Sequence, residues 1–224
     1  MGGGPFTIVC ACSFSGLVGA GAAKAAAARA AGGELLLVDD MCRIAVEEPQ
    51  KLRNFCSGRA VRVFACRPRA AKAVLEFAGA GGDFEFFDMR PPAPGASDGA
   101  GEDAPGGEIR LPPPRGTWVA WYPVIDASRC VSCGKCADFC VFGVYSFSGG
   151  RISVENPRAC KDKCPACARV CPKSAVIFPK CAEEDFICGG EGFAPEASGG
   201  GGGFYEALRR RRAAAGGILR DGGR

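Results

Sequence analysis

Short apolar runs alternate with helical patterns along residues 5–89. Four of these runs are expected to be strands, at 7–10, 35–38, 61–64 and 84–87. Between them, the pattern predicts an alanine-rich helix over 16–31, a helix with Pro49 in its first turn that ends near Cys56, and a helix that opens at Pro68. Short apolar strands separated by helices predict βαβ units, and hence a small α/β domain around a parallel sheet.

Residues 117–180 carry a different pattern, which occurs twice. Each copy has a short apolar strand, a cysteine-rich loop, a helical turn and a second apolar strand. The strands are expected at 124–126 and 143–147 in the first copy, and at 152–155 and 174–178 in the second. This internal repeat predicts a second, α+β domain.

The remaining segments have no apolar period. Residues 90–116 are rich in Pro, Gly, Ala and acidic side chains, which predicts a disordered linker between the two domains. Residues 181–203 are expected to be a Gly-rich loop, and residues 204–224 a basic tail with a short helix at its start.

Composition narrows the chemistry sharply, because the 224 residues include 15 cysteines and no histidine. A chain without imidazole cannot use Ser-His or Cys-His catalysis, nor a zinc site with a histidine ligand. A chain of this length does not need disulfides as its main stabiliser, and the odd cysteine count would leave one thiol unpaired. Metal-bound thiolate in a reducing, cytoplasmic compartment is therefore expected.

The formal charge of +4 belongs to the basic tail. Its arginines outnumber Glu206 and Asp221 by four, so residues 1–203 sum to zero. The arginines are Arg209, Arg210, Arg211, Arg212, Arg220 and Arg224. A solvated end is the simplest interpretation and docking to an acidic redox partner the next. Nucleic-acid binding is not expected without an aromatic platform.

No membrane span is expected either, because Gly and Ser interrupt the uncharged first 23 residues.

Two cysteine cassettes lie within the repeat. The first is Cys130, Cys133, Cys136 and Cys140, and the second is Cys160, Cys164, Cys167 and Cys171, followed by Pro172. The first spacing, C-x2-C-x2-C-x3-C, is that of the bacterial 4Fe-4S ferredoxin run. Over about 60 residues this region resembles the two-cluster bacterial ferredoxins, in which the last cysteine of each run ligates the other cluster. The resemblance implies Cys130, Cys133, Cys136 and Cys171 for cluster 1, and Cys140, Cys160, Cys164 and Cys167 for cluster 2.

Two features depart from that pattern. Val141 stands where a proline usually follows the first run, and one extra residue separates Cys160 from Cys164. A pair of four-cysteine zinc sites is the alternative, although zinc ribbons do not generate this repeat. No acid-base constellation accompanies the cysteines, which favours electron transfer over catalysis.

The cysteines of the first domain follow its strands. Cys10 and Cys12 end the first strand, Cys42 follows the second, and Cys66 ends the third. Because the carboxyl ends of parallel strands line one edge of a sheet, these four thiols are expected to converge on one rim. Cys56 is expected to be a buried structural thiol, and Cys181 and Cys188 to be non-ligands, with a labile disulfide between them as the main alternative.

Four segments of this domain support a family resemblance. They are Cys-Ala-Cys at 10–12, Asp-Met-Cys at 40–42, Ala-Cys-Arg-Pro-Arg at 65–69 and Phe-Phe-Asp-Met-Arg at 86–90. They resemble the N-terminal domain of the A-type polypeptide of heterodisulfide reductase, which implies a possible third 4Fe-4S cluster on Cys10, Cys12, Cys42 and Cys66. The flavin domain that follows in that family is not expected in a chain of this length. A dinucleotide site at Gly16, Gly19, Gly21 and Asp39 and a purely structural domain with buried thiols are the alternatives.

These observations predict a soluble, cytoplasmic, non-catalytic iron-sulfur protein of anaerobic metabolism. It would carry low-potential electrons between redox enzymes of the hydrogenase or heterodisulfide-reductase kind. The alternatives are an iron-sulfur redox or oxygen sensor, an accessory subunit of such a complex, and a thiol-disulfide oxidoreductase. The last would be unusual, because C-x-C stands where C-x-x-C is expected.

Overall fold

A parallel β-sheet forms one end of the molecule. The computed structural model describes residues 6–12, 14, 17–28, 33–90, 108–181 and 186–192. Within these ranges, five strands lie in the order β4-β3-β1-β2-β5. They are β1 (Phe6–Cys10), β2 (Leu35–Val38), β3 (Ala60–Ala65), β4 (Asp83–Asp88) and β5 (Glu108–Leu111). Every pairing in this sheet is parallel, which confirms the predicted α/β core.

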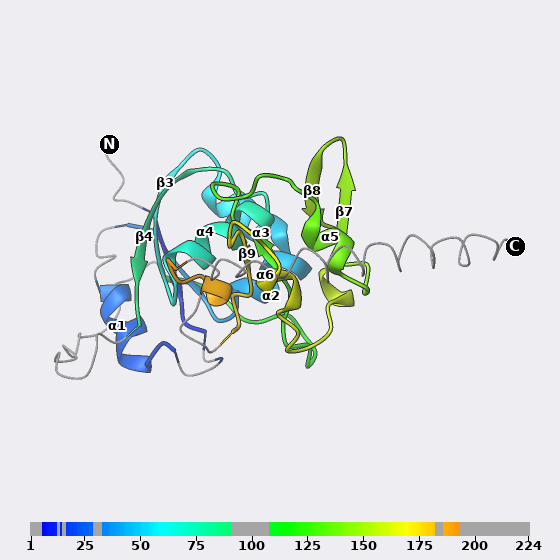
Figure 1. The fold of residues 1–224 in the computed structure, drawn as a ribbon. Helices are drawn as coiled ribbons and strands as arrows, with labels where there is room; N and C mark the ends of the chain where they lie inside the picture. The colour runs from blue at the N-terminus through cyan, green and yellow to red at the C-terminus, as the bar shows by residue number, and fades with distance from the viewer. Residues whose placement is uncertain are drawn as a thin grey trace, which may run out of the picture.

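Helices cover both faces of the sheet (Figure 1). They are α1 (Ala20–Ala28), α2 (Met41–Glu47), α3 (Pro49–Cys56) and α4 (Pro68–Phe77). Proline opens α3 and α4, where its missing N–H costs nothing and its fixed φ suits the first turn. Asp40 caps α2 by accepting a hydrogen bond from the backbone N–H of Arg43 at 3.0 Å. Helix α2 was not predicted separately from α3.

Neighbouring residues of a strand pack on opposite faces of the parallel sheet. Ile8 on β1 packs with α2, α3 and α4 in the larger hydrophobic core, whereas its neighbour Val9 packs with α1 in a smaller one. Successive side chains of a strand point to opposite faces, so strands that are covered on both sides read as continuous apolar runs. The run Leu35 to Val38 has this character for the same reason.

The predicted linker is wrong over its last part. Residues 108–111 form β5, which pairs in parallel with β2 from Leu35–Glu108 to Val38–Leu111. The pairing completes the edge of the sheet, so the α/β unit extends beyond residue 89. Residues 91–107 lie outside the described ranges.

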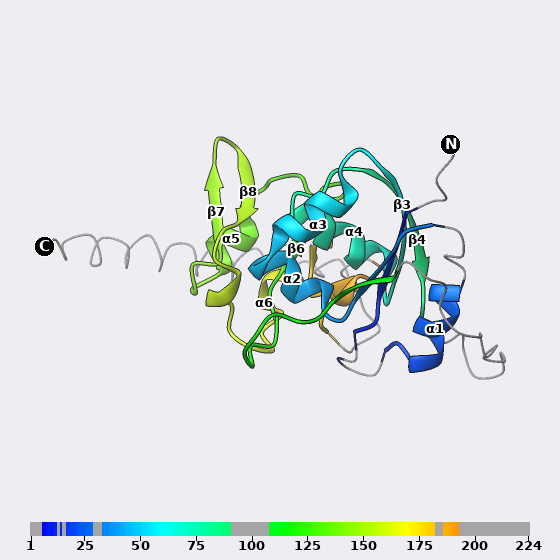
Figure 2. The same ribbon diagram turned by 180° about the vertical axis from the view of Figure 1, so that it is seen from behind.

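The cysteine-rich repeat lies at the other end of the molecule and carries short elements. The first copy holds β6 (Val124–Ile125), α5 (Lys135–Phe139) and β7 (Tyr145–Ser148). The second holds β8 (Arg151–Val154), η2 (Pro157–Ala159), α6 (Ala166–Arg169) and β9 (Val176–Ile177). Strand β6 pairs antiparallel with β9, so the first strand of the first copy lies beside the last strand of the second copy. Strand β7 pairs antiparallel with β8, which follows it in the chain. Figure 2 shows the β7-β8 hairpin far from the parallel sheet.

The two halves share one hydrophobic core. Tyr122, Val124 and Ile177 are fully buried among the side chains of α2, α3 and α4. The Tyr122 hydroxyl donates a hydrogen bond of 2.7 Å to the carbonyl of Cys42. The expected arrangement of two domains joined by a flexible linker is therefore replaced by direct packing.

The segment that was expected to be a Gly-rich loop also contains structure. Residues 186–188 form the 3₁₀ helix η3 (Phe186–Cys188), whose side chains are buried. The expectations for 182–185, for 193–203 and for the basic tail at 204–224 concern residues outside the described ranges. In the described part of the chain, no helix is long and apolar enough to cross a bilayer.

Candidate metal centres

The first candidate centre combines three cysteines of the first cassette with one of the second. Cys130, Cys133, Cys136 and Cys171 line a single pocket, whose walls include Ile125, Ile152 and Val176. Cys136 and Cys171 are each 8% exposed, whereas Cys133 faces solvent. This set is the one that the ferredoxin resemblance implies for cluster 1.

Backbone N–H groups point at two of these sulfur atoms. The N–H of Ser132 donates to Sγ of Cys130 at 3.4 Å, and the N–H of Ala175 donates to Sγ of Cys171 at 3.3 Å. Such bonds stabilise the negative charge of a thiolate and of a cluster bound to it. Ser132 reaches this geometry with φ at +49°, a strained value for a residue with a side chain.

The second candidate centre gathers Cys140 with three cysteines of the second cassette. Burial, together with repulsion from the neighbouring Cys167, Cys140 and Cys164, raises the pKa of the Cys160 thiol to about 12. The charge of each of the other three thiols therefore acts on Cys160. The Tyr145 hydroxyl donates a hydrogen bond of 3.1 Å to Sγ of Cys167.

The extra residue of the second cassette is absorbed in its loop. Lys163, directly before Cys164, has φ at +56°, and Ser132, directly before Cys133, has φ at +49°. The two loops therefore enter their second cysteine in the same left-handed conformation despite their different lengths. Despite the insertion, Cys160 packs against the hydrophobic cluster that contains Cys167.

The third candidate centre lies at the carboxyl edge of the parallel sheet. Cys10, Cys12, Cys42 and Cys66 line one pocket, as the topology of parallel strands predicts. Burial raises the pKa of the Cys10 thiol far above its usual range, and the nearby Cys12 and Cys66 raise it further. Burial likewise raises the pKa of the other three thiols.

A buried lysine closes this pocket from the cysteine-rich half, and the sequence did not point to it. Lys180 is 6% exposed, lines the pocket and forms an ion pair with Asp40, the residue that caps α2. Burial alone lowers the pKa of Lys180, but the hydrogen bond and charge of Asp40 outweigh it, so the pKa lies above its ordinary value. A permanent positive charge therefore stands beside thiols that would be negative as ligands.

The remaining cysteines are separate from these sets. Cys56 ends α3, is fully buried and belongs to the hydrophobic core, as expected. Cys181 and Cys188 form a disulfide, which was the alternative rather than the favoured interpretation. In the dinucleotide site that was considered as an alternative, Asp39 forms an ion pair with the guanidinium of Arg110 at 3.0 Å, and Gly16 lies outside the described residues.

The donor sets fit iron-sulfur clusters by their chemistry. The first and third sets each offer four thiols in a largely apolar pocket, and no carboxylate lines either pocket. Across the described ranges, no three Cys, Asp or Glu side chains stand close enough to hold a single metal ion. Because thiols with raised pKa values must lose protons to act as ligands, metal binding at these sites would release protons.

Comparison with known proteins finds a partial relative. A protein named "uncharacterized ferredoxin" from Methanocaldococcus jannaschii is 44% identical to this chain over 46 residues. The match covers 20% of this chain and 31% of the relative, so the chain spans less than a third of that protein. No protein-family model and no solved structure matches the chain.

The match supports a ferredoxin-like domain within the chain. The resemblance of residues 5–89 to the A-type polypeptide of heterodisulfide reductase stays a prediction, and so do the three ligand sets.

Proposed function

We propose that this chain is an iron-sulfur electron-transfer protein with two 4Fe-4S clusters in residues 117–180 and a third at the edge of the parallel sheet. Cluster 1 would be held by Cys130, Cys133, Cys136 and Cys171. Cluster 2 would be held by Cys140, Cys160, Cys164 and Cys167, and the third cluster by Cys10, Cys12, Cys42 and Cys66. When bound, each cluster supplies a one-electron redox couple.

The observation that carries the proposal is the position of Cys171. It belongs to the second cassette by sequence, yet it lines the pocket of Cys130, Cys133 and Cys136. A four-cysteine zinc site would take its ligands from paired knuckles, whereas the exchange of the last cysteine between runs is the ferredoxin arrangement. The partial relative named ferredoxin adds independent support.

The surroundings of the thiols suit a carrier rather than a catalyst. Four cysteine ligands complete each cluster and leave it without an open position for a substrate. The Tyr145 hydroxyl and the N–H groups of Ser132 and Ala175 would tune the potential by hydrogen bonds to sulfur. The protein thus positions, insulates and tunes the clusters.

We place the protein between larger redox enzymes, of the hydrogenase or heterodisulfide-reductase kind, as a carrier of low-potential electrons. Large apolar side chains are exposed beside the first cassette, including Val131 at 59%, Val141 at 73% and Phe142 at 41%. Apolar groups around a redox centre favour close approach of a partner protein. A partner docked there would bring its own centre near Cys133, the exposed member of its set.

Anaerobic iron and sulfide analysis tests the proposal, with electron paramagnetic resonance on the reduced protein. Three clusters require about twelve irons per chain, and two require about eight. About eight irons would remove the third cluster, and a mononuclear zinc content would overturn the whole assignment.

Two variants test the ligand exchange. Cys171→Ala is expected to disturb the spectrum of the same cluster as Cys133→Ala, although the two residues lie in different cassettes. Cys56→Ala is the matched control, because Cys56 is buried and outside all three sets. Its iron content should equal that of the parent protein. Disturbance of different clusters by the first two variants would contradict the exchange.

A further inference from the structure

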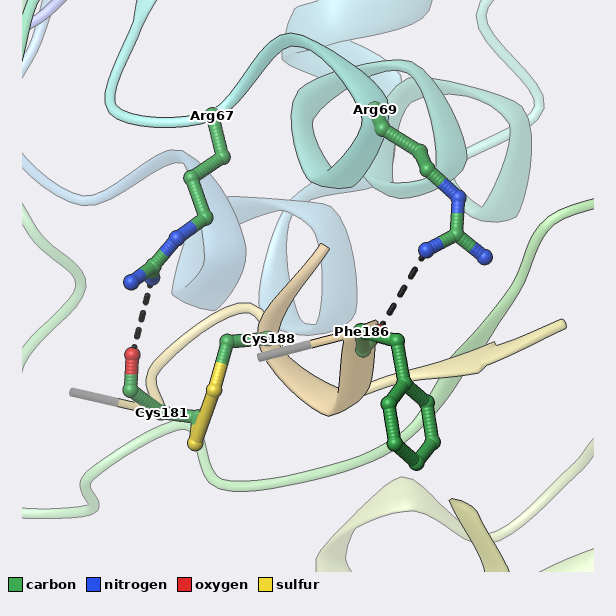
Figure 3. Close-up of a disulfide and its surroundings, with 5 residues drawn as sticks. All are labelled: Arg67, Arg69, Cys181, Phe186 and Cys188. Atoms are coloured by element: carbon green, nitrogen blue, oxygen red, sulfur yellow. Dashed lines mark hydrogen bonds between the residues drawn. A yellow bond between two sulfur atoms is a disulfide. The ribbon is translucent and has the colours of Figure 1, made fainter. Parts of the chain in front are cut away.

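The Cys181–Cys188 disulfide is buried. Cys181 is 4% exposed and Cys188 is fully buried. Their Cα atoms lie 5.1 Å apart, inside the usual range for a bridged pair. The pair joins the end of the cysteine-rich repeat to η3 (Figure 3).

On one side, the disulfide packs with the cysteines of the ferredoxin-like half. A single hydrophobic cluster contains both of its cysteines together with Cys136, Cys171 and Cys167. These three are proposed ligands of cluster 1 and cluster 2. The disulfide therefore shares its packing environment with both centres.

On the other side, the disulfide adjoins the pocket at the sheet edge. Arg67, which directly follows Cys66, is 1% exposed and donates a hydrogen bond of 2.9 Å to the carbonyl of Cys181 (Figure 3). Lys180, which directly precedes Cys181, lines the pocket itself. The disulfide thus lies between the ferredoxin-like half and the third set of thiols.

We propose that Cys181–Cys188 is a redox-active disulfide that exchanges electrons with the iron-sulfur centres of this chain, an inference that rests on the proposed function. The S–S bond accepts two electrons, delivered singly by reduced 4Fe-4S clusters, and takes up two protons from water. The bond breaks and two thiols form, while the clusters return to their oxidised state. Two one-electron donors match one two-electron acceptor.

Burial decides the route of those electrons. Exchange with an external thiol requires a thiolate to reach a sulfur atom, and neither sulfur of this pair belongs to an exposed residue. Electrons can pass through packed protein without such contact. The guanidinium group of Arg67 donates to the carbonyl of Cys181, and positive charge next to the pair favours the reduced form by stabilising developing thiolate.

Stepwise anaerobic reduction of the cluster-loaded protein tests the proposal. An electrochemically reduced viologen supplies electrons, and samples are quenched in acid, alkylated and digested. Mass spectrometry of the peptide that contains Cys181 and Cys188 then reports its thiols, while absorbance reports the clusters in the same sample. The expected result is a bridged peptide in the oxidised protein, and about two alkyl groups on it once the clusters are reduced.

Variants add a second readout, the number of electrons taken up per chain. Cys181→Ser with Cys188→Ser should take up about two fewer electrons than the parent, whereas Cys56→Ala should take up the same number. If the double variant misfolds, the peptide measurement on the parent protein still decides the question.

Two results would overturn the proposal. These are free thiols in the fully oxidised protein and a bridge that survives complete reduction of the clusters. A chain that loads and reduces its clusters but keeps the bridge refutes the redox-active disulfide alone. A chain that binds no iron refutes the proposed function first.

Discussion

Arg69 ties helix α4 to three other segments, and its removal is the sharpest test of how the two halves are held together. Its Nε atom donates to Asp126 at 2.6 Å, and Nη1 donates to the carbonyls of Phe186 at 3.3 Å and Gly190 at 2.9 Å. Nη2 donates to the carbonyl of Ser174. The side chains of Arg69 and Asp126 are only 7% and 10% exposed, so this ion pair is largely shielded from water.

Replacing Arg69 with Met keeps most of the stem and removes every one of these donors. Breaking a buried ion pair typically costs about 3–5 kcal/mol. The lower end applies here, because Asp126 keeps hydrogen bonds from the N–H of Ser128 at 3.0 Å and its hydroxyl at 2.5 Å. A polar cavity of about 360 Å³ that both partners line would also admit water to the freed groups. The expected loss is about 3 kcal/mol.

A loss of that size lowers the melting temperature of a chain of this length by about 6–12 °C. Circular dichroism of the cluster-loaded protein, under anaerobic conditions and at one fixed scan rate, measures the shift. Lys72→Met is the matched control, because Lys72 lies on the same helix and is exposed. A shift for Arg69→Met below about 2 °C, or one equal to that of Lys72→Met, would refute the reasoning.

Three further predictions concern single contacts. Tyr145→Phe removes the hydrogen bond to Sγ of Cys167. Voltammetry of the proposed cluster 2 should then show a lower potential, by about 40 mV for each 1 kcal/mol by which the bond favoured the reduced form. An unchanged potential contradicts this prediction. Gly189 has a φ of +98°, and Gly189→Ala would place a Cβ atom 2.8 Å from the Cβ atom of Ala70. This substitution should lower the free energy of unfolding by about 2–4 kcal/mol, which a lower melting temperature would show. Cys56 is buried, and that burial raises its pKa to about 11. At pH 8 this thiol of the folded protein should therefore resist iodoacetamide, and the labelling rate should rise about tenfold per pH unit toward pH 11. Rapid labelling at pH 8 argues against the burial.

Two of the three cysteine sets line single pockets, as predicted, because the information behind those predictions is local or topological. The spacing from Cys130 to Cys140 is a property of eleven consecutive residues. The convergence of Cys10, Cys42 and Cys66 follows from one rule, that parallel strands end at the same edge. Neither inference required knowledge of how the two halves pack.

The features that the sequence did not predict depend on contacts between residues that are far apart along the chain. Residues 108–111 stand in a Pro- and Gly-rich stretch and become a strand only through pairing with β2, more than seventy residues earlier. A buried Lys180 is acceptable only because Asp40, 140 residues away in sequence, neutralises it. The disulfide was left as an alternative because spacing alone does not decide whether two thiols face each other.

Strand β5 belongs to the parallel sheet but lies beyond residue 89 in the chain, and this position determines where the protein can be divided for expression. A fragment that ends at residue 89 would lack β5 and leave β2 as a bare sheet edge. Four apolar residues, Leu35 to Val38, would then present unpaired N–H and C=O groups, which invites strand-to-strand aggregation between copies. A fragment boundary beyond Leu111 keeps the edge covered. Even then Tyr122, Val124 and Ile177 leave an apolar face on helices α2 and α4 when they are removed, so co-expression of the two halves is the safer design.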